Sequence, residues 1–213
     1  DNLAGKAATK RDLLRLLNVA LDETTPLIGI VSRLTVQKGF DLLFDSLPQI
    51  LTTRKIALIV LGSGEPRYQD MWRRAAARYP DRIGARIGFD ESLAHGIEAG
   101  ADIFLMPSRF EPCGLNQMYS MRYGTVPVVH GVGGLADTVV DYSPRRKRST
   151  GFVMVDYTPA ALLEALNRAF TLYADPRKWQ GLQLAGMQQD FSWDRSAREY
   201  VKIYERALAG AGG

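Results

Sequence analysis

A turn that holds a carboxylate and an arginine is the part of this sequence whose residue types are best suited to chemistry. The turn, residues 107–115, lies between the apolar run 102–106 and the helix-prone segment 116–121. In a parallel sheet, ligands bind outside the carboxyl ends of the strands, and a helix start offers free backbone N–H groups to a phosphate. Glu111 would then lie a few residues from an anion site. Because a carboxylate and an anion repel unless a cation or a sugar separates them, the turn predicts a sugar-phosphate site.

Two cations follow the first apolar run of the chain. Arg33 and Lys38 are close enough in one loop to reach around a single diphosphate. A transferase that breaks a sugar–phosphate bond must stabilise negative charge on the leaving group, and fixed cations do this electrostatically. The chain has no Asp-x-Asp pair, and its histidines, His95 and His130, are far apart in sequence, so we expect no metal site and no cofactor. Ordinary surface charges are the alternative for both cations.

The composition is that of one packed α/β unit. The 213 residues are 46% hydrophobic and 23% charged, so we expect residues 1–213 to form a single domain. One cysteine excludes an internal disulfide, and no apolar stretch approaches the roughly 20 residues that span a bilayer, which favours a reducing, aqueous compartment. The net charge of +4 equals the charge of the loop 145–148. A nucleic-acid face needs a broad basic stripe, so we expect a solvated loop rather than a polyanion contact, and no nucleic-acid or membrane partner.

Apolar runs and helical patterns alternate along the chain. The runs have the length of strands that are buried on both faces of a parallel sheet: 27–31, 56–61, 82–89 (the weakest), 103–106, 126–129 and 151–155. Between residues 40 and 51 apolar side chains recur at helical spacing, with Pro48 marking a kink or a restart. The pattern is wholly helical after Pro159. The sequence therefore predicts an α/β fold, a Rossmann-like doubly wound parallel sheet of about six strands with helices on both faces.

The candidate residues follow successive strands, and the carboxyl ends of parallel strands meet at one edge of the sheet. In strand order they are Arg33 and Lys38, Gly62 and Gly64, Phe89, Glu111, and Gly133 and Gly134. A single nucleotide-sugar crevice is therefore predicted at this edge. The alternative is that loops simply collect glycines and polar residues.

Three segments resemble one family. Residues 108–117, SRFEPCGLNQ, resemble the signature of bacterial glycogen synthases and plant starch synthases; residues 31–39, VSRLTVQKG, resemble their basic phosphate loop, and 133–139, GGLADTV, their second glycine-rich turn. The resemblance runs over nearly the whole chain. It implies the carboxy-terminal domain of a two-domain GT-B enzyme of the cytoplasm, or of the plastid stroma in a plant or alga. Such an enzyme transfers glucose from ADP-glucose to the non-reducing end of an α-1,4-glucan without a metal or cofactor.

The resemblance also implies roles for three residues. Arg33 and Lys38 would bind the donor phosphates, and Glu111 would contact glucose hydroxyls and support an oxocarbenium-like transition state. The wider superfamily often has a second Glu eight positions on, where this chain has Tyr119. We therefore expect front-face transfer with retention rather than a two-carboxylate double displacement. A structural or helix-capping Glu111 is the alternative.

Further nucleotide contacts are expected from the same turn. Gly114, Leu115 and Asn116 would offer backbone N–H groups to the distal phosphate. The family usually has Thr where Asn116 stands, so no hydroxyl contact is carried over. Cys113 matches a family cysteine, with a small buried apolar side chain as the alternative. Relatives commonly carry Arg at one or both central positions of 129–132, so a cation is absent here or supplied by His130 when protonated.

The nucleobase contact and the reaction class leave alternatives open. Phe89 would offer a flat face to the base, where the family often has Tyr, and a core phenylalanine is the alternative. Adenine is favoured over uracil only by the family branch, so UDP-glucose stays an alternative, as does a non-catalytic nucleotide-sugar or glucan-binding module. A dinucleotide fingerprint, Gly131-x-Gly133-x-x-Ala136 with Asp156 further on, follows the fifth strand instead of the first, which argues against a dehydrogenase.

The last helical segment, 193–208, looks like the one that crosses back to the amino-terminal domain in relatives. That domain would supply the acceptor-glucan contacts. If it is absent, the chain exposes an apolar patch that is expected to drive self-association. The patch consists of Trp193, Tyr200, Val201, Ile203, Tyr204 and Leu208.

Overall fold

The computed structural model describes residues 3–20, 22–146 and 148–210, and a six-stranded parallel sheet forms its centre. The strands are β1 (Leu27–Val31), β2 (Ala57–Gly62), β3 (Ile83–Ile87), β4 (Ile103–Met106), β5 (Val126–His130) and β6 (Phe152–Met154). Their order is β3-β2-β1-β4-β5-β6, so the chain reverses its direction of travel across the sheet between β1 and β4. All six predicted strands are confirmed. The weakest ends earlier than expected because Gly88 turns the chain with φ +146°.

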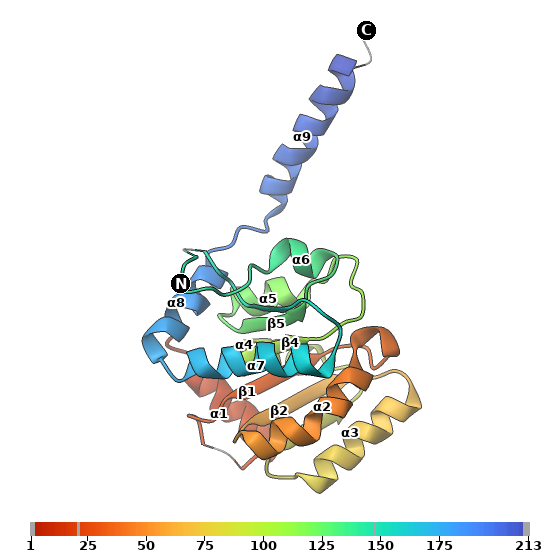
Figure 1. The fold of residues 1–213 in the computed structure, drawn as a ribbon, viewed down its shortest axis with the longest axis vertical. Helices are drawn as coiled ribbons and strands as arrows, with labels where there is room; N and C mark the ends of the chain where they lie inside the picture. The colour runs from red at the N-terminus through yellow and green to blue at the C-terminus, as the bar shows by residue number, and fades with distance from the viewer. Residues whose placement is uncertain (1–2, 21, 147, 211–213) are drawn as a thin grey trace.

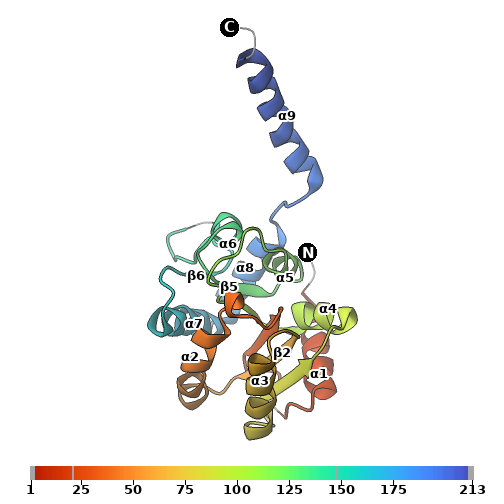
Figure 2. The ribbon, with the colours of Figure 1, turned by 90° about the vertical axis from the view of Figure 1, so that its right-hand side faces the viewer.

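Helices cover both faces of the sheet, as predicted. They are α1 (Lys6–Leu16), the 3-10 turn η1 (Val36–Lys38), α2 (Phe40–Thr53), α3 (Pro66–Arg78), α4 (Glu91–Gly100), α5 (Asn116–Arg122), α6 (Gly134–Thr138), α7 (Pro159–Tyr173), α8 (Pro176–Met187) and α9 (Trp193–Gly210). Figure 2 shows α2, α3 and α7 on one face of the sheet and α1 and α4 on the other.

Successive strand side chains enter two different cores. Ile28 and Leu58 pack with α2 and α7, while Leu27 and Ile59 pack with α1 and α4. This alternation explains the continuous apolar runs, because a strand covered on both faces has no solvent side. Each fully buried aliphatic side chain stabilises the fold by about 1.5 to 3 kcal/mol. The sheet is therefore a rigid base for the loops at its edges.

Helix α2 continues through Pro48, so of the two expectations for this proline, a kink or a restart, the restart is wrong. Proline inside a helix removes one backbone hydrogen bond and costs about 3 kcal/mol. The flanking residues Leu47, Ile50 and Leu51 are all buried in the core. Their burial offsets this cost and keeps the helix intact.

A buried lysine closes the amino edge of the sheet. The Nζ atom of Lys10 donates to the carbonyl oxygens of Glu23 and Thr25, at 2.6 and 2.7 Å, and to Asp102 Oδ2 at 2.6 Å. The same carboxylate oxygen accepts from the Leu27 N–H at 2.8 Å. Lys10 is only 3% exposed, and three acceptors compensate its charge. The pair fixes α1 to the starts of β1 and β4.

Helix α9 projects away from the body of the molecule, as Figure 1 shows. No residue of α9 is buried, and the six apolar side chains predicted for its patch are all exposed. Among the described residues, no helix has the length and apolar character required to cross a membrane. In the loop 145–148, Arg145, Arg146 and Arg148 are exposed as predicted, and Lys147 lies outside the described residues.

Candidate active site

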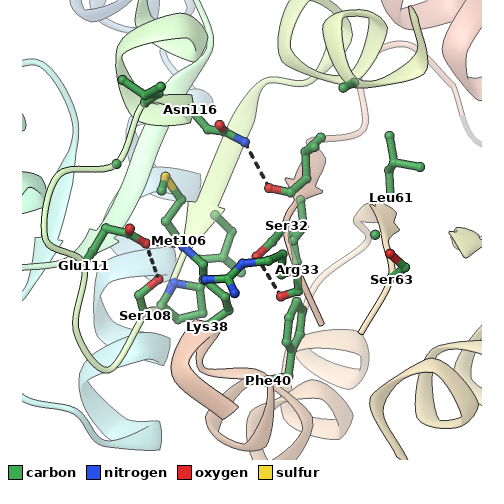
Figure 3. Close-up of a pocket in the computed structure, with 18 of the residues that line it drawn as sticks. Ser32, Arg33, Lys38, Phe40, Leu61, Ser63, Met106, Ser108, Glu111 and Asn116 are labelled. Carbon is green, nitrogen blue, oxygen red and sulfur yellow. Dashed lines mark hydrogen bonds and ion pairs between the residues drawn. The ribbon is translucent and has the colours of Figure 1, made fainter. Parts of the chain in front are cut away.

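A pocket of about 470 Å³ opens at the carboxyl edge of the sheet, beside β1 and β4, where the strand order reverses. Figure 3 shows Glu111 and Ser108 on one side of this pocket and Ser63 on another, with Arg33 and Lys38 between them. Eight of the predicted site residues line it: Arg33, Lys38, Gly62, Phe89, Glu111, Gly114, Leu115 and Asn116. The structure therefore brings these eight residues together around one pocket, and its role as a nucleotide-sugar crevice stays a prediction.

Lys38 and Glu111 form an ion pair at the base of the turn. Their side chains are 17% and 9% exposed, and Ser108 Oγ lies 3.4 Å from the same Glu111 oxygen. Partial burial strengthens the attraction, because little water screens it. Helix α5 has Leu115 as its N-cap and no side-chain cap bond, so the helix-capping alternative for Glu111 is wrong.

Arg33 differs from Lys38 in having no carboxylate partner among the described residues. Its side chain is exposed, and Nη2 lies 3.4 Å from the amide oxygen of Gln37. That bond is long and weak. Arg33 is therefore a cation whose guanidinium is available to an anionic ligand.

The basic loop and the turn that carries Glu111 are in direct contact. The Arg109 N–H donates to the Gln37 carbonyl at 2.9 Å, and Gln37 Nε2 donates to the Phe110 carbonyl at 3.3 Å. Gly39 has φ +78°, and a Cβ placed there would lie 1.9 Å from the Pro107 carbonyl oxygen. Only glycine permits this approach. Sequence reasoning missed Gln37, although it lies inside the basic motif.

Gly114 shapes the start of α5. Its φ is +71°, a conformation that favours glycine. In the described part of the chain, the N–H groups of Gly114, Leu115 and Asn116 donate to no protein acceptor. The Asn116 side chain donates to the Val31 carbonyl at 3.0 Å and so ties α5 to β1. Unpaired N–H groups beside two cations can bind an anion.

Gly64, Gly133 and Gly134 do not line the pocket but support its loops. The Gly134 N–H donates to the Glu111 carbonyl at 3.0 Å, and a Cβ on Gly134 would lie 2.0 Å from the Cys113 carbonyl oxygen. A Cβ on Gly64 would lie 2.4 Å from the Leu34 carbonyl oxygen. These glycines therefore hold the turn and the basic loop in place.

Four further residues considered above lie at different distances from the pocket: Phe89 lines it, and Cys113, His130 and Tyr119 do not. Phe89 is 91% exposed at the pocket, so the core alternative is wrong. Cys113 is also exposed, which contradicts a buried apolar role, and it is not among the residues that line this pocket. His130 is buried, with Nδ1 2.7 Å from the Ser108 carbonyl oxygen. Tyr119 is partly exposed and lines a different hollow, so position 119 places no carboxylate beside Glu111.

The chain and known proteins share this architecture. The family model described as "Glycosyl transferases group 1" matches residues 18–180. The chain belongs to this family. It is 56% identical over 207 residues to a glycogen synthase of Anaeromyxobacter dehalogenans, covering 97% of this chain and 43% of that protein. It is 52% identical to a glycogen synthase of Aromatoleum aromaticum, again over 43% of that protein.

Solved structures also resemble this chain in fold. The catalytic domain of starch synthase IV from Arabidopsis thaliana, bound to ADP and acarbose, superposes with a TM-score of 0.88 at 34% identity, covering 98% of this chain and 44% of that one. Sucrose-phosphate synthase from Thermosynechococcus elongatus gives a TM-score of 0.68 at 25% identity, over 94% of this chain and 49% of that one. The chain thus has a Rossmann-like α/β fold that matches one part of these GT-B glycosyltransferases, and it spans less than half the length of the glycogen synthases it matches.

Proposed function

We propose that this chain is the nucleotide-sugar-binding, carboxy-terminal domain of a retaining, ADP-glucose-dependent glycogen synthase. The observation that carries the proposal is the joint position of Arg33, the Lys38–Glu111 pair and the unpaired N–H groups of residues 114–116, at the start of α5, around one pocket. The names of its relatives support it, as does the ADP bound to the starch synthase. The bacterial glycogen synthases among these relatives also support a location in the cytoplasm.

The two cations, Arg33 and Lys38, offset the electrostatic repulsion between Glu111 and a bound phosphate. Lys38 already neutralises Glu111, and Arg33 is free to bind the diphosphate. Among the described residues, no group of three or more His, Cys, Asp or Glu side chains could hold a metal ion. In the proposed reaction, Arg33, Lys38 and the α5 N–H groups stabilise the negative charge that develops on the leaving group.

The proposed transfer proceeds on one face of the sugar. The bond between glucose C1 and the phosphate oxygen breaks, and the electron pair leaves with ADP. The acceptor hydroxyl attacks C1 from the same face and gives its proton to the departing phosphate oxygen. Glu111 stabilises the positive charge of the oxocarbenium-like sugar. No second carboxylate is required, in agreement with Tyr119.

Two alternatives remain as outcomes of experiment: a UDP-glucose transferase and a non-catalytic binding module. We propose adenine as the base, stacked against the exposed ring of Phe89. Calorimetric titration of residues 1–213 with ADP and with UDP tests this choice. Tighter binding of UDP would overturn it, and binding of neither nucleotide would overturn the proposed phosphate site.

A second test compares this chain with the full-length protein, using labelled ADP-glucose and glycogen. The full-length protein should elongate the glucan, and the chain alone should not. Alignment of two substrates in a closed cleft supplies roughly 7 to 11 kcal/mol of a barrier, and one open domain lacks that alignment. Transfer by the chain at the full-length rate would contradict the half-site proposal. A full-length protein that binds ADP without transfer would favour the binding module.

A further inference from the structure

Four side chains form a connected cluster behind the turn that carries Glu111. We call it the Arg109 cluster. It consists of Asp41 at the start of α2, Arg109 in the turn, His130 at the end of β5, and Tyr157 in the loop before α7. None of the four is among the residues that line the pocket. The cluster therefore lies outside the site described above while touching its main loop.

Asp41 joins two of the other members. One carboxylate oxygen forms an ion pair with Arg109, and the other accepts a hydrogen bond from the Tyr157 hydroxyl at 2.8 Å. The guanidinium carbon of Arg109 lies 4.9 Å from the centre of the Tyr157 ring. Arg109 is thus held by a charge on one side and an aromatic face on the other, an arrangement that restricts its position more than a single ion pair would.

His130 connects the cluster to the neighbouring residue of the turn. Its ring centre lies 5.4 Å from that of Tyr157, and its Nδ1 lies 2.7 Å from the Ser108 carbonyl oxygen. A carbonyl oxygen accepts only, so Nδ1 carries the proton. Because His130 is 6% exposed, this hydrogen bond is well shielded from water. The cluster therefore fixes residues 108 and 109, three and two positions before Glu111.

The hydrogen-bond directions in the cluster are stable near neutral pH. Burial, together with the bond to Asp41, raises the pKa of Tyr157 to about 12, so its hydroxyl remains a donor. Burial opposes ionisation of Asp41, but the hydrogen bonds from Arg109 and Tyr157 outweigh it and lower the pKa of that carboxyl. Asp41 therefore stays ionised and remains an acceptor.

We propose that the Arg109 cluster positions Glu111 for sugar transfer. The inference rests on the proposed function, in which Glu111 acts on the donor glucose. Arg109, Phe110 and Pro112 of the turn are exposed, so contacts with neighbouring elements hold the turn rather than burial of its own side chains. A displacement of about 1 Å at a reacting centre can cost about 100-fold in rate. Fixing Ser108 and Arg109, three and two positions before Glu111, to α2, β5 and the loop before α7 prevents such a displacement.

The test uses the full-length protein and its steady-state kinetics. Arg109→Ala should lower kcat by about 10- to 100-fold, with KM for ADP-glucose and the ADP dissociation constant within about threefold of wild type. Arg109→Lys retains a charge for Asp41 but loses the planar contact with Tyr157, so it should recover part of kcat. The matched control is Arg54→Ala, because the Arg54 guanidinium lies 6.0 Å from the Phe170 ring at the opposite edge of the sheet. The control should leave kcat, KM and the ADP dissociation constant unchanged.

A double variant separates positioning from a general loss of structure. If Arg109 acts through Glu111, adding Arg109→Ala to Glu111→Gln should lower kcat by less than about twofold further, since the group being positioned is already impaired. Multiplied losses would overturn the inference. If Arg109→Ala fails to fold, Tyr157→Phe replaces it. That variant removes one hydroxyl and keeps the ring, and it should lower kcat about 3- to 10-fold at unchanged KM.

The outcomes also separate this inference from the proposed function. An inactive wild-type protein would contradict the proposed function. An active wild type with kcat unchanged in Arg109→Ala, or in Tyr157→Phe, would contradict only the positioning role.

Discussion

The ion pair between Lys38 and Glu111 makes the two cations of the basic loop unequal. Both Arg33→Ala and Lys38→Ala should lower transfer strongly, because each removes a phosphate contact of about 1.5 to 3 kcal/mol that strengthens in the transition state. Lys38→Ala should also lower the free energy of unfolding by about 1 to 3 kcal/mol, because it leaves the shielded Glu111 unpaired. Arg33→Ala should change it by less than about 0.5 kcal/mol.

Chemical denaturation of the two variants measures this difference. Equal stabilities would show that the Lys38–Glu111 pair contributes nothing to the fold. Wild-type transfer rates in either variant would remove that residue from the proposed mechanism.

Substitution of Glu111 separates binding from turnover. Glu111→Gln retains the shape of the side chain and an oxygen for Lys38, but removes the charge that supports the cationic sugar. ADP affinity should stay within about threefold while kcat falls by more than about 100-fold. Calorimetry and single-turnover kinetics on the full-length protein provide the two numbers. A parallel loss of ADP affinity would assign Glu111 a structural role.

Contact between the glycine-rich turn before α6 and the Glu111 turn leads to a prediction for that element. Gly134→Ala should lower stability by about 1 to 3 kcal/mol and weaken both ADP binding and transfer, because the added Cβ would lie 2.0 Å from the Cys113 carbonyl oxygen. The matched control is Gly96→Ala in α4, where a Cβ meets no atom within 4 Å. The control should gain about 0.5 to 1 kcal/mol of stability from helix propensity. Thermal unfolding and ADP titration of both variants would show whether the effects diverge.

Helix α4 also contains a carboxyl group that makes stability depend on pH. Burial raises the pKa of Glu98 to about 7, with a smaller opposing effect of His95. A raised pKa in the folded state means that stability is full below the unfolded value, near 4.5, and is lost as the pH rises through about 7. Between pH 5 and pH 8 the free energy of unfolding should fall by about 2 to 3 kcal/mol from this group. Glu98→Gln should flatten the profile, and an unchanged slope would contradict the assignment.

Most elements of the fold could be predicted because their signals are local. The six strands follow from short apolar runs, and the start of α5 follows from the turn before it. The course of α2 through Pro48 could not be predicted from local propensity, since tertiary packing of Leu47 and Leu51 decides it. Helices α3 and α4 were implied by the alternation, although their bounds depend on which faces are buried, and α1, which precedes the first strand, was not predicted.

The candidate site was predictable only for residues that line it. Arg33, Lys38 and Glu111 follow strands, and strand ends converge at one edge. The contacts that support the site could not be predicted. Asp41, Arg109 and Tyr157 are far apart in sequence, so their contacts leave no local pattern. Likewise, the support that Gly64 and Gly134 give to neighbouring loops depends on distances that only the folded chain defines.

At the scale of the whole molecule, α9 makes no contribution to the core. Removal of residues 193–213 should therefore change the melting temperature of the chain by less than about 2 °C. It should also abolish concentration-dependent self-association, because the apolar patch of α9 is exposed. Sedimentation velocity of residues 1–213 and of residues 1–192 tests whether self-association is lost. Persistent association of the shortened chain would place the interface on the sheet domain instead.

The separation of the Lys10–Asp102 pair from the pocket has a consequence for the evolution and redesign of donor choice. The pair fixes one edge of the sheet, while every residue proposed to contact the donor lies at the other edge. The exposed positions 89 and 115 can therefore be randomised to select for a new nucleobase without disturbing that anchor or the glycines at 88 and 114. A library at these positions should retain a high fraction of folded members, whereas an equally diverse library around Lys10 should not. Donor choice and fold stability thus depend on residues at opposite ends of the same strands.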